Sequence, residues 1–161
     1  MTARSLQLCD ACILVTSHTG AKVVARVVTY GQTVGPNDVD LSPEAYDVVK
    51  DPSGARGMTW QLVTCPRTTM QYQWQTGANV YWTSLWVRGE SSPVAKLEVK
   101  SANHPSFTAL TRGTDGTFTD PGGFGAGAFT LRVTSIDGRV VTDTFPSFTP
   151  GSLSASSGTL D

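Results

Sequence analysis

Three cysteines and a histidine are the first residues of this chain whose spacing suggests chemistry. Cys9 and Cys12 form a Cys-x-x-Cys pair, His18 follows shortly afterwards, and Cys65 lies much further along the chain. Such a set could hold zinc, but its spacing is loose. A redox Cys-x-x-Cys needs a βαβ context that the sequence lacks. The odd cysteine count instead predicts a structural disulfide to Cys65 and one remaining thiol, with the partner of Cys65 left open. We expect no metal and no cofactor.

Aromatic residues form the second group with possible chemistry. The chain has four Trp and four Tyr, and such rings can fill a β core or stack on sugars. Tyr81 and Trp82 are adjacent, and adjacent side chains on a regular strand point to opposite faces. One of the two is therefore expected in the core and one in solvent; the alternative is that both are core residues. Trp74 and Trp86 are expected to pack inside the same core.

The elements that must position these residues are short strands joined by turns. Only 16% of the residues are charged, and the chain carries 16 Gly and 9 Pro, a composition that favours strands over long helices. One helix is predicted over residues 42–50, because Ser42 is a good N-cap and Pro43 suits the first helical position. Runs of β-branched residues predict a hairpin and then a further strand, over residues 11–16, 22–29 and 58–64.

The second half of the chain reads as a run of strands. About seven short strands with close-spaced turns are typical of an immunoglobulin-like β-sandwich. The final segment, residues 147–161, is rich in Ser, Gly, Thr and Pro, and this composition predicts a disordered tail. The strands of the sandwich are expected at residues 71–75, 80–88, 95–100, 107–110 and 139–145, with a further strand around Phe129, Leu131 and Val133.

Charge and hydropathy exclude several classes of partner. The formal net charge of −1 gives no overall field toward nucleic acid or anionic membranes. No apolar run approaches the length that spans a membrane. The first eight residues lack the apolar stretch of a secretion signal.

Seven stretches of the chain, in order, resemble the microbial expansins. The resemblance implies a mainly β chain, with a six-stranded double-psi β-barrel followed by a carbohydrate-binding β-sandwich. Residues 1–65 would be an N-terminally incomplete barrel domain, because only eight residues precede Cys9, and residues 66–146 would be the cellulose-binding sandwich. The matching stretches are Cys9-Asp-Ala-Cys12-Ile-Leu-Val-Thr, Gly35-Pro-Asn-Asp-Val-Asp-Leu-Ser-Pro-Glu-Ala-Tyr46, Thr59-Trp-Gln-Leu-Val-Thr-Cys-Pro66, Tyr81-Trp82, Trp86-Val-Arg88, Pro93-Val-Ala-Lys-Leu-Glu98 and Ile136-Asp-Gly-Arg-Val-Val-Thr-Asp-Thr-Phe-Pro146.

The resemblance also assigns candidate site residues. Asp40 would lie in the barrel groove, where its counterpart in related hydrolases donates a proton; the structural alternative is that Asp40 only organises the start of the helix. Thr29 stands where the family has an aspartate. Gly31 and Val34 replace loop cysteines, and Asp38 falls where plant-type members have a histidine. Glycoside hydrolysis needs two carboxyl groups at a set separation, so the chain is predicted not to be an enzyme.

The expected function is therefore non-hydrolytic binding of plant-type cell-wall polysaccharide, chiefly cellulose, with loosening of the wall as an accompanying activity. By resemblance, Tyr81 and Trp82 form an aromatic platform for sugar rings; the third platform ring falls near Gly116, where Phe118 could substitute. The protein is expected to be an extracellular monomer that binds neither nucleic acid nor membranes. Two alternatives are a β-glucan-cleaving hydrolase with Asp40 as the acid, and a truncated product that retains only carbohydrate binding.

Overall fold

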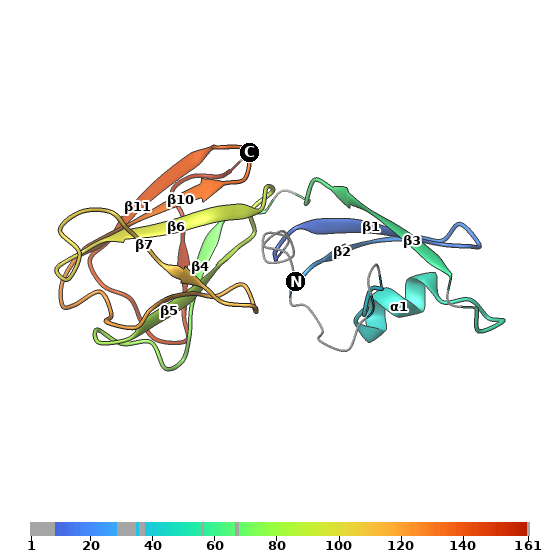
Figure 1. Ribbon diagram of the computed structural model, residues 1–161, viewed down its shortest axis with the longest axis horizontal. Helices are drawn as coiled ribbons and strands as arrows, with labels where there is room; N and C mark the ends of the chain where they lie inside the picture. Colours follow the sequence, from blue (N-terminus) through green and yellow to red (C-terminus); the bar gives the residue numbers. More distant parts are fainter. Residues whose placement is uncertain (1–8, 29–34, 36–37, 56, 67, 161) are drawn as a thin grey trace.

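Twelve strands and one helix make up the described part of the chain in the computed structural model. The structure describes residues 9–28, 35, 38–55, 57–66 and 68–160. The strands gather into two bodies, one holding β1 to β3 with the helix and the other holding the remaining strands (Figure 1). The elements are β1 Cys12–Ser17, β2 Lys22–Arg26, α1 Pro43–Val49, β3 Met58–Val63, β4 Gln71–Trp74, β5 Thr83–Arg88, β6 Val94–Lys100, β7 Thr108–Ala109, β8 Thr111–Arg112, β9 Phe118–Asp120, β10 Phe129–Ser135, β11 Val140–Phe145 and β12 Leu153–Ala155.

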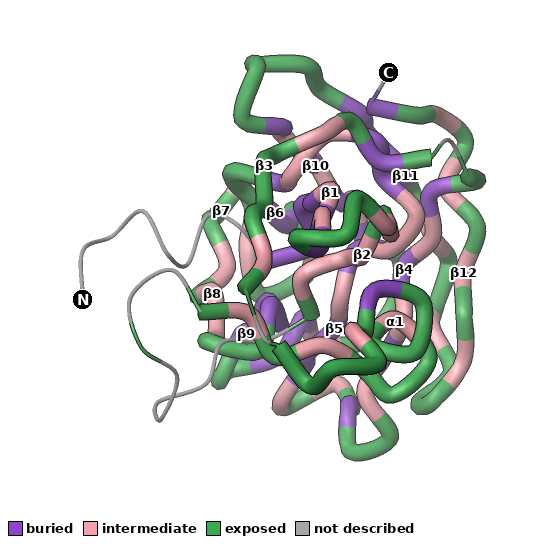
Figure 2. Tube along the Cα trace, turned by 90° about the vertical axis from the view of Figure 1, so that its right-hand side faces the viewer, coloured by how far each residue is buried: buried purple, intermediate pink, exposed green. Residues whose placement is uncertain are grey.

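The first body is an antiparallel sheet in the order β2-β1-β3 with α1 against it. The predicted hairpin is confirmed, because β1 pairs with β2, and β3 adds the third strand on the other side of β1. The predicted helix is also confirmed: the Ser42 hydroxyl accepts a hydrogen bond from the Ala45 amide at 3.3 Å, which satisfies one of the free N–H groups of the first turn. Val49 is the buried residue of α1, and most of the helix surface faces solvent (Figure 2).

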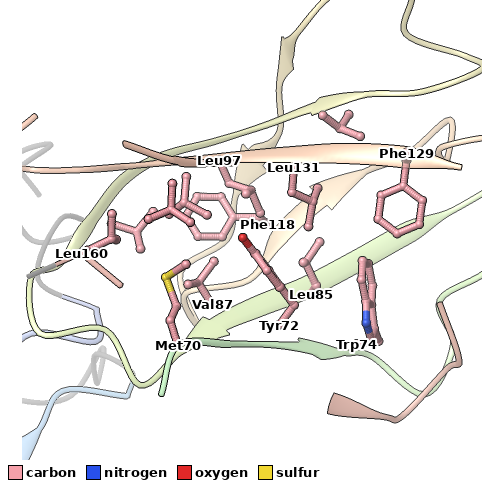
Figure 3. Close-up of a cluster of buried hydrophobic side chains, with 14 of the residues drawn as sticks. Met70, Tyr72, Trp74, Leu85, Val87, Leu97, Phe118, Phe129, Leu131 and Leu160 are labelled. Atoms are coloured by element: carbon pink, nitrogen blue, oxygen red, sulfur yellow. The ribbon is translucent and has the colours of Figure 1, made fainter. Parts of the chain in front are cut away.

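The second body is a β-sandwich of two antiparallel sheets, in the orders β11-β10-β6-β7 and β12-β4-β5-β9-β8. Alternate residues of each strand point inward, so the core lies between the sheets. Figure 3 shows Tyr72, Trp74 and Leu85 of one sheet facing side chains of the other, including Leu131 and Phe129. Trp74 is a core residue as predicted, only 1% exposed. Nine strands form the sandwich rather than about seven. The strand predicted at 107–110 is replaced by the short strands β7 and β8, and neither β9 nor β12 was predicted.

The prediction of a disordered tail over residues 147–161 is wrong. β12 pairs with β4, the Phe148 ring stacks on Trp74 at a centroid distance of 4.5 Å, and Leu160 is fully buried. The composition favours disorder, but Phe148 and Leu160 of this segment pack against the core. The serine hydroxyls also find a partner, since Ser156 and Ser157 both donate to Asp143. The sandwich therefore continues to residue 160 instead of ending at Pro146.

The cysteines form the expected kind of disulfide. Cys12 at the start of β1 is bonded to Cys65, and Cys9 is a buried free thiol. His18 has a different partner, because its Nε2 lies 2.6 Å from the Asp51 carboxylate. Within the described residues, no helix is both long and apolar enough to cross a membrane.

Candidate functional site

A tight turn presents the two predicted platform aromatics. The Asn79 side-chain oxygen accepts hydrogen bonds from the amides of Tyr81 and Trp82, at 2.9 and 3.1 Å. β5 begins only at Thr83, so the expectation that both residues lie on a regular strand is wrong. Tyr81 is 80% exposed, whereas Trp82 is half-buried. The alternative that both rings belong to the core is therefore excluded for Tyr81.

A polar and aromatic surface continues from this turn along the outward side of β4 and β5. On β5, Leu85 and Val87 point into the core, so Ser84, Trp86 and Arg88 point outward, and Trp82 has the same parity. On β4, Tyr72 and Trp74 point inward, which leaves alternate glutamines outside. We call this surface the β4–β5 outer face, and it consists of Gln71, Gln73, Gln75, Trp82, Trp86 and Arg88. Ser84 has the same parity but is fully buried, with its hydroxyl hydrogen-bonded to that of Thr119.

The two rows of this face are held in register by the sheet. Gln73 lies directly across from Trp86, and Gln71 lies across from Arg88. Arg88 Nε donates to the Gln73 side-chain oxygen at 3.0 Å. Sequence reasoning missed the glutamine row, although the alternation Gln71-Tyr-Gln-Trp-Gln75 was a signal for one polar and one buried face.

Trp86 does not pack in the core as predicted. It is half-buried on the outward side of β5, with its Nε1 donating to the Asp115 carbonyl at 3.1 Å. The Arg88 guanidinium lies over the indole, 5.0 Å from the ring centroid. The reason is strand parity: Leu85 and Val87 take the inward positions, so residue 86 must face out.

Phe118 is not a platform residue. It is 2% exposed on the inward side of β9, within the sandwich core, and the Arg112 guanidinium covers its ring at 5.1 Å. Gly116 is also buried, and a side chain there would meet Cys9, since a Cβ would lie 3.3 Å from the Cys9 Cβ. The segment around Gly116, where the resemblance places a third ring, therefore presents no aromatic side chain to solvent. The Trp86 indole donates a hydrogen bond to the carbonyl of the preceding residue, Asp115.

Asp40 is exposed, two residues before the N-cap of α1. Its side chain makes no hydrogen bond or ion pair within the described part of the chain. The Asp38 carboxylate accepts a hydrogen bond from the nearby Gly35 amide at 3.2 Å. Thr29, Gly31 and Val34 lie outside the described residues.

Buried charges connect the β4–β5 outer face to the first body. Arg88 Nη1 lies 2.9 Å from the Asp10 carboxylate, and Arg26 of β2 lies 3.3 Å from the Glu90 carboxylate. Burial, reinforced by the neighbouring Asp10 charge, raises the pKa of Glu90 from its ordinary value to about 8. Burial also raises the pKa of Asp10, against the opposing effect of Arg88. These groups fix Arg88, and through it Trp86, relative to the first sheet.

This arrangement of a small β sheet with one helix beside a β-sandwich is the fold of an expansin. The chain superposes on the crystal structure of a mutant Clavibacter michiganensis expansin in complex with cellohexaose with a TM-score of 0.84 and 21% identity, covering 96% of this chain and 76% of that one. The apo form of the Clavibacter expansin gives a TM-score of 0.81 and 22% identity over the same shares. The predicted fold class, mainly β with a partial double-psi barrel followed by a β-sandwich, is confirmed.

The sequence relatives agree with the fold. Expansin-like protein 6 of Dictyostelium discoideum is 26% identical over 149 residues, which cover 86% of this chain and 51% of the relative. Expansin-YoaJ of Bacillus subtilis is 27% identical over 119 residues, or 67% of this chain and 46% of the relative. The chain thus spans about half the length of the curated relatives it matches. No family model matches the chain. The resemblance to microbial expansins is confirmed.

Proposed function

We propose that this chain binds cellulose-type polysaccharide without hydrolysing it, and that it can loosen contacts between such polymers. Tyr81 and the β4–β5 outer face form the binding site. The observation that carries this proposal is the 80% exposure of Tyr81, a large ring that a side-chain-capped turn holds out in solvent beside Trp82. The Clavibacter expansin of the same fold was crystallised with cellohexaose, which supports a glucan as the ligand.

Stacking is the plausible source of the binding energy. Glucan is neutral and the chain has a net charge of −1, so long-range attraction contributes little. Hydrogen bonds to sugar hydroxyls largely replace those made with water and leave about 1 kcal/mol each. Aromatic rings remove apolar area from water at about 25 cal/mol per Å². Glutamine amides beside the rings can fix the orientation of the sugar hydroxyls.

Replacing Trp82 with alanine is expected to weaken binding to cellulose about tenfold, equivalent to about 1.4 kcal/mol. Trp82 is expected to be one of the few aromatic contacts that dominate such a surface. Depletion binding to crystalline cellulose measures the effect. Val140→Ala is the matched control, since Val140 is an exposed apolar residue on β11 of the other sheet.

Thermal melting separates a binding role from a structural one. If Trp82→Ala lowers the melting temperature strongly while the folded fraction still binds normally, Trp82 is a packing residue. If Tyr81→Ala and Trp82→Ala both bind like the unaltered chain, the polysaccharide site lies elsewhere.

A β-glucan-cleaving hydrolase is the second candidate function. It would need two carboxyl groups around the scissile bond, and Asp40 is exposed without a charged partner among the described residues. We expect no release of reducing sugar from cellulose, xylan or mixed-linkage glucan over prolonged incubation. Sustained release that disappears in Asp40→Asn would establish the hydrolase instead.

The same proposal places the protein outside the cell as a monomer. The Cys12–Cys65 disulfide supports an oxidising environment. A product that retains only the carbohydrate-binding sandwich would share the platform residues but not any wall-loosening activity, and a wall-extension assay separates the two.

A further inference from the structure

We propose that Trp86 is a third stacking residue, which extends the glucan site along β5 and makes binding depend on the length of the sugar chain. This inference rests on the proposed function of the same face. It goes beyond that function because it assigns a specificity-determining role to a residue outside the Tyr81-Trp82 turn.

The position of Trp86 follows from the regular geometry of β5. Trp82 is the residue just before β5, and Trp86 lies four residues further on with the same parity. A strand rises by about 3.3 Å per residue, so their Cα atoms lie at most about 13 Å apart. That separation is longer than two linked sugar rings can bridge by stacking. A disaccharide therefore cannot stack fully on both indoles, whereas a longer chain lying along the strand can.

Trp86 is held in place before any ligand binds. Its indole N–H is fixed by the Asp115 carbonyl at 3.1 Å, and the Arg88 guanidinium lies 5.0 Å from the ring centroid. Arg88 is itself anchored by the buried Asp10 carboxylate at 2.9 Å. A ring that is already ordered loses little side-chain entropy on binding, so more of its stacking energy appears as affinity.

Polar groups beside Trp86 can hydrogen-bond a sugar that stacks on its ring. Gln73 lies directly across from it, and the Gln73 side-chain oxygen is taken by Arg88. The Gln73 amide N–H groups have no acceptor among the residues that the structure describes. They can donate to hydroxyls at the rim of a sugar stacked on Trp86, while an exposed ring without polar neighbours could not fix the sugar's orientation.

The test compares two ligand lengths by calorimetry, with cellobiose and cellohexaose as the probes. In the unaltered chain, cellohexaose is expected to bind at least tenfold more tightly than cellobiose. Trp86→Ala should remove most of that ratio by weakening cellohexaose binding about tenfold, with a small effect on cellobiose. Trp82→Ala should weaken both ligands.

Control variants keep the result interpretable. Trp86→Phe retains a ring and should retain most of the ratio. Trp86→Leu retains apolar bulk without a ring and should lose the ratio, which tests the inference even if Trp86→Ala fails to fold. If Trp82→Ala weakens binding but the ratio survives in Trp86→Leu, the inference on Trp86 is overturned and the proposed function stands. If the unaltered chain binds neither oligosaccharide nor cellulose, both are overturned.

Discussion

Replacing Leu160 with alanine is expected to destabilise the sandwich by about 2–5 kcal/mol, the usual cost of such a truncation in a core. Leu160 is fully buried in the core, near the end of the chain, and joins a cluster that includes Met70 and Val141. Its backbone cannot move to fill the cavity, because its carbonyl accepts hydrogen bonds from Ser91 Oγ at 3.0 Å and from Arg139 Nη1 at 3.1 Å.

Urea denaturation followed by tryptophan fluorescence measures this effect. Leu153→Ala is the matched control, because Leu153 comes from the same segment but is 57% exposed, and surface changes of this kind usually stay within about 0.5 kcal/mol. Equal, small effects in the two variants would mean that the C-terminal segment does not contribute to the core in solution.

Replacing Glu90 with glutamine is expected to stabilise the protein at alkaline pH by on the order of 5 kcal/mol, because burial raises the pKa of Glu90 from 4.5 to about 8 and each pKa unit corresponds to about 1.4 kcal/mol. The Glu90 side chain is completely buried, and its Oε2 has no hydrogen-bond partner in the described structure. The groups that act on it are the Asp10 carboxylate, which raises its pKa, and Arg26 and Arg88, which lower it.

The sign follows from proton linkage. Burial raises the pKa of Glu90 from 4.5 to about 8 in the folded state, so between these values the folded protein binds more protons than the unfolded chain. Stability from this group is present below pH 4.5 and is lost as the pH rises through about 8. Glutamine resembles the protonated form, so the two proteins should differ little at pH 5 and increasingly toward pH 9.

Unfolding free energies at several pH values test this expectation. Glu44→Gln is the control: Glu44 is exposed at the start of α1, and the backbone and Ser42 hydrogen bonds lower its pKa, so it stays ionised in this range. A constant difference between Glu90→Gln and the unaltered chain from pH 5 to 9 would show that Glu90 is ionised when folded.

Local signals in the sequence predicted the local elements well. The Ser42-Pro43 pair defined the start of the helix, and β-branched runs defined β1, β2 and β3, because caps and strand propensity act over a few residues. The two sides of β5 are harder to predict from sequence. Residue type alone predicts a core position for Trp86, whereas strand alternation with the inward residues Leu85 and Val87 places it outward.

Features that depend on distant partners could not be predicted. The burial of Leu160 depends on its packing in a cluster with residues distant in sequence, such as Met70. The pairs Arg88–Asp10 and Arg26–Glu90 join residues 78 and 64 positions apart in the chain. The alternation of side chains along a regular strand does not apply to Tyr81, because the Asn79 side chain holds a turn there. A strand pattern in the sequence does not reveal such a side-chain interaction.

The Cys12–Cys65 bond makes almost the whole first body a covalent ring. It joins two cysteines 53 positions apart and so encloses β1, β2, α1 and β3. In a chain-entropy model, closing a ring of that size lowers the conformational entropy of the unfolded state and so stabilises the folded state by about 4 kcal/mol. The sandwich lies outside the ring and carries the β4–β5 outer face. Reducing conditions would therefore loosen the first sheet, whereas the β4–β5 outer face lies on a body whose described residues contain no disulfide.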